Sequence, residues 1–167
     1  MMAATMDAIS LPTGFLDATA RLALATLLGA IIGINRELGR KPAGLRTHSL
    51  VALGGAIAAL LALHLSPAGG VADAQAISRI VQGILTGVGF IGAGVILHRE
   101  DSRGVHGLTT AASIWVVAAV GTATALGLWR IGVVSVVLLL LVFAIGGPLD
   151  RALHRWRRKE SVAVDDD

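Results

Sequence analysis

The chain has 167 residues, of which 54% are hydrophobic and 15% are charged, and its mean hydropathy is +0.76. This balance lies outside the range of soluble globular domains and indicates an integral membrane protein. Since the chain has no cysteine, a disulfide framework and a thiolate metal site are excluded. The net charge is +3, and the basic residues are placed along the chain as the positive-inside rule requires. Membrane topology therefore explains the basicity, and we expect no nucleic-acid partner.

Five apolar segments of near-bilayer length follow one another along the chain, and they predict an all-α membrane protein with five transmembrane helices. The predicted spans are 16–34, 48–65, 77–97, 108–126 and 131–149. No Lys or Arg precedes the first span, so it is not expected to be a cleaved signal peptide. We expect an external segment at 1–15, a transmembrane domain at 16–149 and a charged cytoplasmic tail at 150–167.

The basic residues predict the orientation, because cytoplasmic connections are enriched in Lys and Arg. Most of them fall in the 35–47 and 98–107 turns and in the tail, whereas Arg21, Arg79 and Arg130 lie towards the other side. The N-terminus is therefore expected outside and the C-terminus in the cytoplasm. Gly146, Gly147 and Pro148 are expected to end the fifth helix.

The first two spans resemble the next two, since 29–58 aligns with 92–121 without a gap. This alignment predicts two related helical hairpins, placed side by side about an axis along the membrane normal. Nine pairs are identical: Gly29/Gly92, Ala30/Ala93, Arg36/Arg99, Glu37/Glu100, Arg40/Arg103, Gly44/Gly107, Leu45/Leu108, Thr47/Thr110 and Ala56/Ala119.

Glycines indicate where helices approach closely in lipid, because small residues let backbones meet. The third span is the richest in glycine and is therefore predicted to be the hub, while the Val/Leu/Ile-rich fifth span is predicted to face lipid. Gly29 and Gly33 form one GxxxG pattern and Gly83 and Gly87 another. Each fits either a contact within the chain or a homodimer face.

The two charged turns offer candidate ion pairs. Arg36 and Glu37 are adjacent, as are Arg99 and Glu100, and adjacent side chains on a helix do not face each other. A two-fold relation between the hairpins would allow the swapped pairs Arg36 to Glu100 and Arg99 to Glu37. The alternative is that these residues anchor at the interface, with Glu37 paired to Lys41.

Other polar residues have local explanations. Arg21 lies within the first span, where Asp17 is an available partner one turn earlier, and Gln82 and Thr86 are candidates for a buried polar site on the third span. Thr47 and Thr110 fit caps or first-turn positions of the second and fourth helices. Such helix N-termini, with Arg46 nearby, also fit an anion such as a lipid headgroup.

A metal site or a pump receives little support from the sequence. Apart from Asp17, no acidic residue lies inside a predicted span, although Mg²⁺ sites use carboxylates. No P-loop pattern is present, which excludes a self-contained ATP-driven pump. We expect no enzyme activity and no cofactor, with Mg²⁺ considered only as a ligand or transported ion.

Three motifs in this order, PAGLRTH, GVGFIGAG and GLTTAAS, resemble the membrane domain of the MgtC/SapB family, and the similarity extends over 22–127. The resemblance implies a bacterial inner-membrane protein that acts in magnesium homeostasis and, in some pathogens, in survival inside host cells. Members were first described as transport components and are also regarded as regulators that bind membrane complexes, including the F-type ATP synthase.

The matched positions that carry function by this resemblance lie mainly in and beside the two charged turns. They are Arg36, Glu37, Gly44, Leu45, Arg46, Thr47, Gly89, Gly92, Gly94, Gly107, Leu108, Thr109, Thr110 and Trp115. Thr109 occupies a position where virulence-associated members have Asn, and the chain ends soon after the fifth span, without the cytoplasmic domain of many members. The leading hypothesis is a modulator of other membrane proteins, and the alternative is a Mg²⁺ transporter or channel component.

Overall fold

The computed structural model describes residues 14–65, 74–97 and 107–164, and these residues form five α-helices. The helices are α1 (Phe15–Leu38), α2 (Leu45–Leu65), α3 (Ala74–Leu97), α4 (Leu108–Ala125) and α5 (Trp129–Val164). Each is long and apolar enough to cross a membrane, which confirms the predicted all-α, five-span fold.

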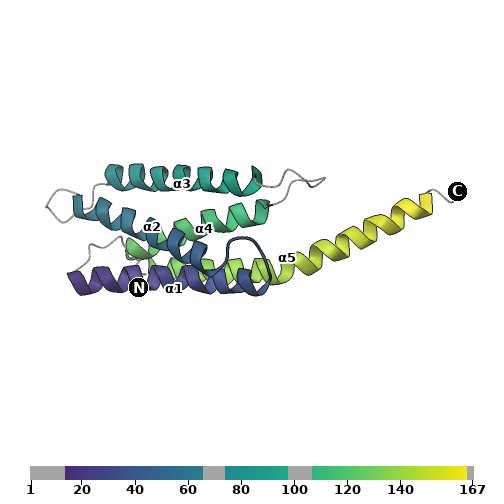
Figure 1. Ribbon diagram of the computed structural model, residues 1–167, viewed down its shortest axis with the longest axis horizontal. Coiled ribbons are helices and arrows are strands. Elements are labelled where there is room, and N and C mark those ends of the chain that lie inside the picture. The colour runs from purple at the N-terminus through teal and green to yellow at the C-terminus, as the bar shows by residue number, and fades with distance from the viewer. Residues whose placement is uncertain (1–13, 66–73, 98–106, 165–167) are drawn as a thin grey trace, which may run out of the picture.

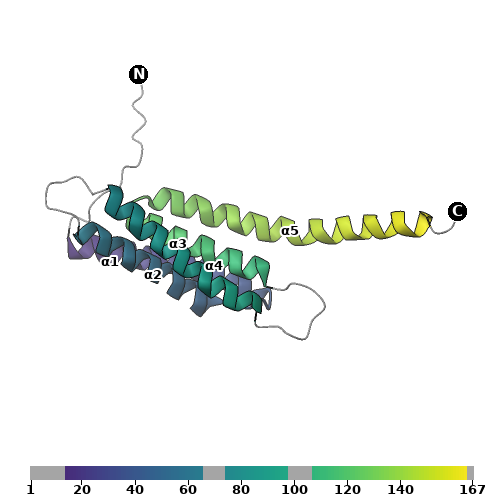
Figure 2. The ribbon, with the colours of Figure 1, turned by 90° about the horizontal axis from the view of Figure 1, so that it is seen from above.

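The helices are arranged in three layers (Figure 1). The first layer is α3, the second contains α2 and α4, and the third contains α1 and α5. Figure 2, seen from the side of α3, shows α3 in front of α2 and α4. Within the described residues, α3 contacts α2 and α4 but neither α1 nor α5.

The hub of the bundle is α4, which contacts all four other helices. The prediction that the third span is the hub was therefore wrong. The prediction relied on glycine content, but most glycines of α3 do not contact another helix. An added Cβ would have no neighbour within 4 Å at Gly83, Gly87, Gly89 or Gly94. The residues that allow close packing are instead in α1, α2 and α4, where alanines and glycines bring backbones together. The expectation of a lipid-facing α5 agrees with the mostly exposed side chains of its residues 129–149.

Two close contacts follow the predicted repeat. A Cβ added to Gly29 would lie 2.6 Å from the carbonyl oxygen of His48, and the aligned glycine, Gly92, packs at 3.4 Å on the aligned residue, Ala111. Gly55 and Ala118 are also aligned with each other, and they touch across the α2–α4 contact. A pair of equivalent residues in contact lies on the symmetry axis, so the structure supports two hairpins related by a two-fold.

The helix ends explain where the connections turn. α4 ends in a Schellman motif: the Leu128 amide donates to the Ala123 carbonyl and Gly127 has a φ of 89°. α1 ends in the same arrangement, in which the Lys41 amide donates to the Arg36 carbonyl. There, however, the left-handed position belongs to Arg40, with a φ of 51°.

The prediction that Gly146, Gly147 and Pro148 end the fifth helix was wrong, because α5 continues to Val164. A proline removes one backbone donor and bends a helix, and where the chain leaves the bilayer water can satisfy the freed carbonyl. In Figure 1, α5 changes direction where it leaves the bundle and then projects well beyond it.

Candidate functional site

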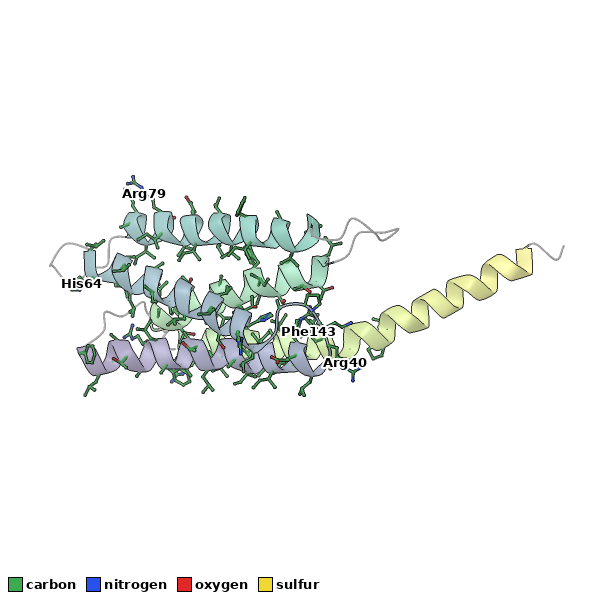
Figure 3. All side chains as sticks on the ribbon, viewed as in Figure 1. Arg40, His64, Arg79 and Phe143 are labelled. Carbon is green, nitrogen blue, oxygen red and sulfur yellow. The ribbon has the colours of Figure 1, made fainter. Side chains whose placement is uncertain are left out.

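A buried polar network lies at the end of the bundle where Figure 3 labels Arg40 and Phe143, here called the basic end. Arg36 is only 5% exposed although it lies in the last turn of α1. Its Nη2 donates a hydrogen bond to Oγ1 of Thr110 in the first turn of α4. The guanidinium also lies 5.1 Å from the ring centroid of Phe143 on α5, within the range of a cation–π interaction.

His48 continues this network into α2. Its Nδ1 is 3.0 Å from the Gly44 carbonyl, and its Nε2 is 3.1 Å from Oγ of Ser113. The Ser113 hydroxyl donates to the Thr110 carbonyl at 2.8 Å. An imidazole with a carbonyl on Nδ1 carries its proton there, which leaves Nε2 as an acceptor in the neutral ring. Ser113 has a single hydroxyl hydrogen, so it donates either to the Thr110 carbonyl or to Nε2, one at a time. The network therefore joins α1, α2, α4 and α5 at one level of the membrane.

The charge of this centre is positive. The buried polar side chains of the described residues are Arg36, His48, Thr110, Ser113, Thr122 and Thr124, and none of these is acidic. In the described part of the chain, Nε of Arg36 is buried without a hydrogen-bond partner. A buried guanidinium repels cations at its level, because Coulomb interactions are strong where water is excluded.

Glu37, next to Arg36, has a different role. Its Oε2 accepts from the Leu45 amide at 3.0 Å, so the carboxylate caps the N-terminus of α2. Gly44 lies directly against this carboxylate. The proposed Glu37–Lys41 ion pair does not form among the described residues. Arg99 and Glu100, the other members of the swapped pairs, lie outside the described residues.

Thr110 is a first-turn residue of α4, but its hydroxyl binds Arg36 rather than capping the helix. The N-cap of α4 is Gly107, with a φ of 87° and no side-chain cap. A Cβ there would lie 2.9 Å from the Val95 carbonyl oxygen, so the position needs glycine. Thr47 is partly buried in the first turn of α2.

The remaining residues singled out by resemblance do not join the network. Arg46, Leu108, Thr109 and Trp115 are exposed in the first half of their helices. Gly89 and Gly94 lie on the exposed side of α3, whereas Gly92 packs on Ala111. The resemblance therefore marks three places on the molecule: the network, the exposed surface of the basic end and the outer side of α3.

At the opposite end, Arg21 pairs with Asp17 at 2.9 Å, as the spacing of one turn suggested. Its Nη1 also donates to the Ala125 carbonyl at the C-terminus of α4. This places a positive charge on the negative end of the α4 dipole. A pocket of about 350 Å³ lies beside the pair, lined also by Thr124 and Trp129.

Gln82 and Thr86 do not form the buried polar site that was considered for them. Both are exposed in the single chain, because α3 lies at the edge of the bundle and packs through the side that carries Ile77 and Gly92.

The sequence reasoning did not select His48, Ser113 or Phe143. His48 closes the PAGLRTH motif and Ser113 closes GLTTAAS, so both were inside the motifs that carry the resemblance. A polar side chain within an apolar helix is costly unless it is partnered, and that signal would have identified both residues. Phe143 gives no such signal, because a phenylalanine in an apolar helix is ordinary.

Comparison with known proteins identifies the chain. A sequence model described as the MgtC family matches residues 22–152, which include the whole network. The chain belongs to the MgtC family. The predicted resemblance is thereby confirmed, and this MgtC-family chain is a multi-pass membrane protein.

Three named relatives are similar to the MgtC-family chain. It is 43% identical to Protein SrpB of Synechococcus elongatus over 83% of this chain and 80% of SrpB. It is 40% identical to "Putative magnesium transporter YhiD" of Escherichia coli K12, over 75% of this chain and 58% of YhiD. It is 38% identical to Protein MgtC of Salmonella typhimurium, over 71% of this chain and 48% of that protein.

The chain thus spans about half of the Salmonella relative and little more than half of the Escherichia coli one. No solved structure matches the chain.

Proposed function

We propose that this protein acts in magnesium homeostasis as a non-enzymatic modulator, which binds other membrane proteins and changes their activity. Membership of the MgtC family and the name of the Escherichia coli relative, a putative magnesium transporter, support a role in magnesium homeostasis. The observation that carries the mode of action is the buried Arg36 network. Its centre is a guanidinium held by neutral groups, which favours a packed regulatory bundle over a cation path through one chain.

The proposal includes an orientation in the bacterial inner membrane. Arg36, Arg40, Lys41 and Arg46 belong to one end of the bundle, so the positive-inside rule supports a cytoplasmic basic end and an external N-terminus. The exposed residues of this end, together with the helix faces, form the surface offered to a partner. The F-type ATP synthase is a candidate partner through the family resemblance.

Affinity purification tests the partner-binding role. Tagged protein is purified from membranes of cells grown at low and at high Mg²⁺, and co-purifying membrane proteins are identified and quantified. The proposal expects at least one partner whose recovery changes with the Mg²⁺ supply and falls with Arg46→Ala, which removes an exposed charge without disturbing the network. Recovery of the same proteins by an unrelated five-helix membrane protein would contradict it.

A Mg²⁺ transport component is the second candidate, favoured by the name of the Escherichia coli relative. Purified protein in liposomes loaded with a Mg²⁺-sensitive dye distinguishes the two. A modulator leaves the Mg²⁺ flux at the level of empty liposomes. A transporter raises the flux, and under that hypothesis Glu37→Gln or Glu100→Gln abolishes the increase.

A further inference from the structure

One side of α3 has no partner within the described chain. It carries Gln82, Gly83, Thr86, Gly87, Phe90 and Gly94, here called the α3 outer face. These residues recur at intervals of three and four, so they lie along one side of the helix. All six are exposed, and a Cβ added to any of the three glycines would meet nothing within 4 Å. Figure 3 shows Arg79, one turn earlier, pointing away from the other helices.

The polar groups of this face are placed unfavourably for contact with lipid. Gln82 and Thr86 lie well inside the span Gln75–Ile96, and neither side chain has a hydrogen-bond partner among the described residues. Four other threonines in the spans donate their hydroxyl to the carbonyl four residues earlier; these are Thr19, Thr26, Thr122 and Thr124. An amide in hydrocarbon without a partner is costly, which indicates that another protein surface covers this face.

We propose that the α3 outer face binds the same face of a second copy, forming a two-fold dimer within the membrane. Two copies inserted in the same orientation can be related only by an axis along the membrane normal, which places every residue level with its own counterpart. Phe90 is 84% exposed and lies between Gly87 and Gly94. The two Phe90 rings are thus level with each other, and Gly87 and Gly94, about one turn to either side, leave a notch that gives both rings room.

The polar residues match in the same way. A glutamine side chain both donates and accepts, so Gln82 can pair with Gln82 or with Thr86 of the partner at the same depth. The glycines allow the two α3 helices to cross closely at the level of Gly83 and Gly87. The helices diverge from the crossing point, so the two Arg79 side chains are farther apart, towards the membrane surface. A second copy therefore supplies the facing ring (the knob), the space at the glycines (the notch) and the hydrogen bonds without any further component.

Disulfide trapping tests the contact directly, because the chain has no cysteine of its own. Ala93→Cys places a thiol on the exposed side of α3, and Leu138→Cys places one on the exposed side of α5 as the control. Oxidation of each variant in native membranes is expected to link Ala93→Cys into dimers and to leave Leu138→Cys monomeric. Equal linking of the two variants, or linking of neither, would overturn the proposal.

Filling the notch tests its energetics. Gly87→Leu is expected to raise the dimer dissociation constant in liposomes at least tenfold, measured by energy transfer between labelled copies at increasing dilution. Gly54→Leu makes the same change at an exposed glycine of α2 that also has open space around it, and is expected to leave the constant unchanged. Phe90→Ala removes the knob and should weaken the dimer in the same direction. A chain that stays monomeric at every protein-to-lipid ratio, or equal effects of Gly87→Leu and Gly54→Leu, would overturn the proposal.

Discussion

Arg36 of the first hairpin and Thr110 of the second are joined by a hydrogen bond inside the basic end of the bundle. Thr110 is held in turn through its carbonyl, which accepts from Ser113, the partner of His48. A charged side chain thereby connects two halves of the chain that the sequence describes as copies of one another. The contact is arginine to threonine; the Arg36–Glu100 pair that the charges of the turns suggested involves a residue outside the described ones and stays a prediction.

The strength of this connection can be measured with a double-mutant cycle. Thr110→Val leaves Nη2 of Arg36 buried without its acceptor, and is expected to lower the free energy of unfolding by about 1–3 kcal/mol. When Arg36 is already Met, the same Thr110→Val change should cost less than about 0.5 kcal/mol, because no buried donor remains to be satisfied. Reversible unfolding in mixed detergent micelles provides the four free energies.

The Arg36→Met, Thr110→Val double variant also separates stability from function. Since Nε of Arg36 is already without a partner among the described residues, an apolar replacement of both side chains should be nearly neutral or stabilising. If the double variant is as stable as the parent and has lost its partners in affinity purification, the charge serves function. A loss of more than about 2 kcal/mol would mean that the pair is a major structural contact.

Glu37 provides a second prediction, because its carboxylate accepts the first amide of α2. Glu37→Ala is expected to destabilise the protein by about 1 kcal/mol, the usual value of an N-terminal cap. Glu37→Gln keeps an acceptor but loses the charge near the helix dipole, so its cost should be about 0.3–1 kcal/mol. Lys41→Ala is the control and should have no effect, since no Glu37–Lys41 pair forms among the described residues. Equal costs for Glu37→Ala and Lys41→Ala would contradict the capping role.

The α1–α2 turn contains a third testable feature. Ala43 has a φ of 59°, a left-handed conformation that an L residue adopts at a cost and glycine adopts freely. Ala43→Gly is therefore expected to raise the free energy of unfolding by about 0.5–1 kcal/mol, after allowing for the larger backbone entropy of glycine in the unfolded chain. Ala62→Gly, in the interior of α2, is the control and should destabilise by at least about 1 kcal/mol. The midpoints of thermal unfolding of both variants give the comparison.

Much of this architecture could be predicted from the sequence because it depends on local properties. Apolar length predicted five helices, and aligned residues predicted the two hairpins. The central helix could not be predicted in this way, because a glycine shows that a backbone can approach but does not show which one does. Gly83 and Gly87 of α3 and Gly121 of α4 are alike in sequence, yet only Gly121 has a neighbour against it. The network of Arg36, His48 and Ser113 depends on the same tertiary packing.

Gly121 therefore gives the sharpest prediction about the fold. A Cβ at this position would lie 2.0 Å from the carbonyl oxygen of Ala52, and neither α4 nor α2 can yield without a backbone shift. Gly121→Ala is expected to destabilise the bundle by about 3 kcal/mol or to prevent its folding, the upper range for overpacking a core. Gly54→Ala, where nothing lies within 4 Å, should be neutral or stabilise α2 by up to about 1 kcal/mol through helix propensity. Detergent unfolding and the yield of folded protein in membranes measure both variants. If the two alanine variants proved equally stable, α2 and α4 could not pack as closely as the structure shows, and α4 would not be the hub of the bundle.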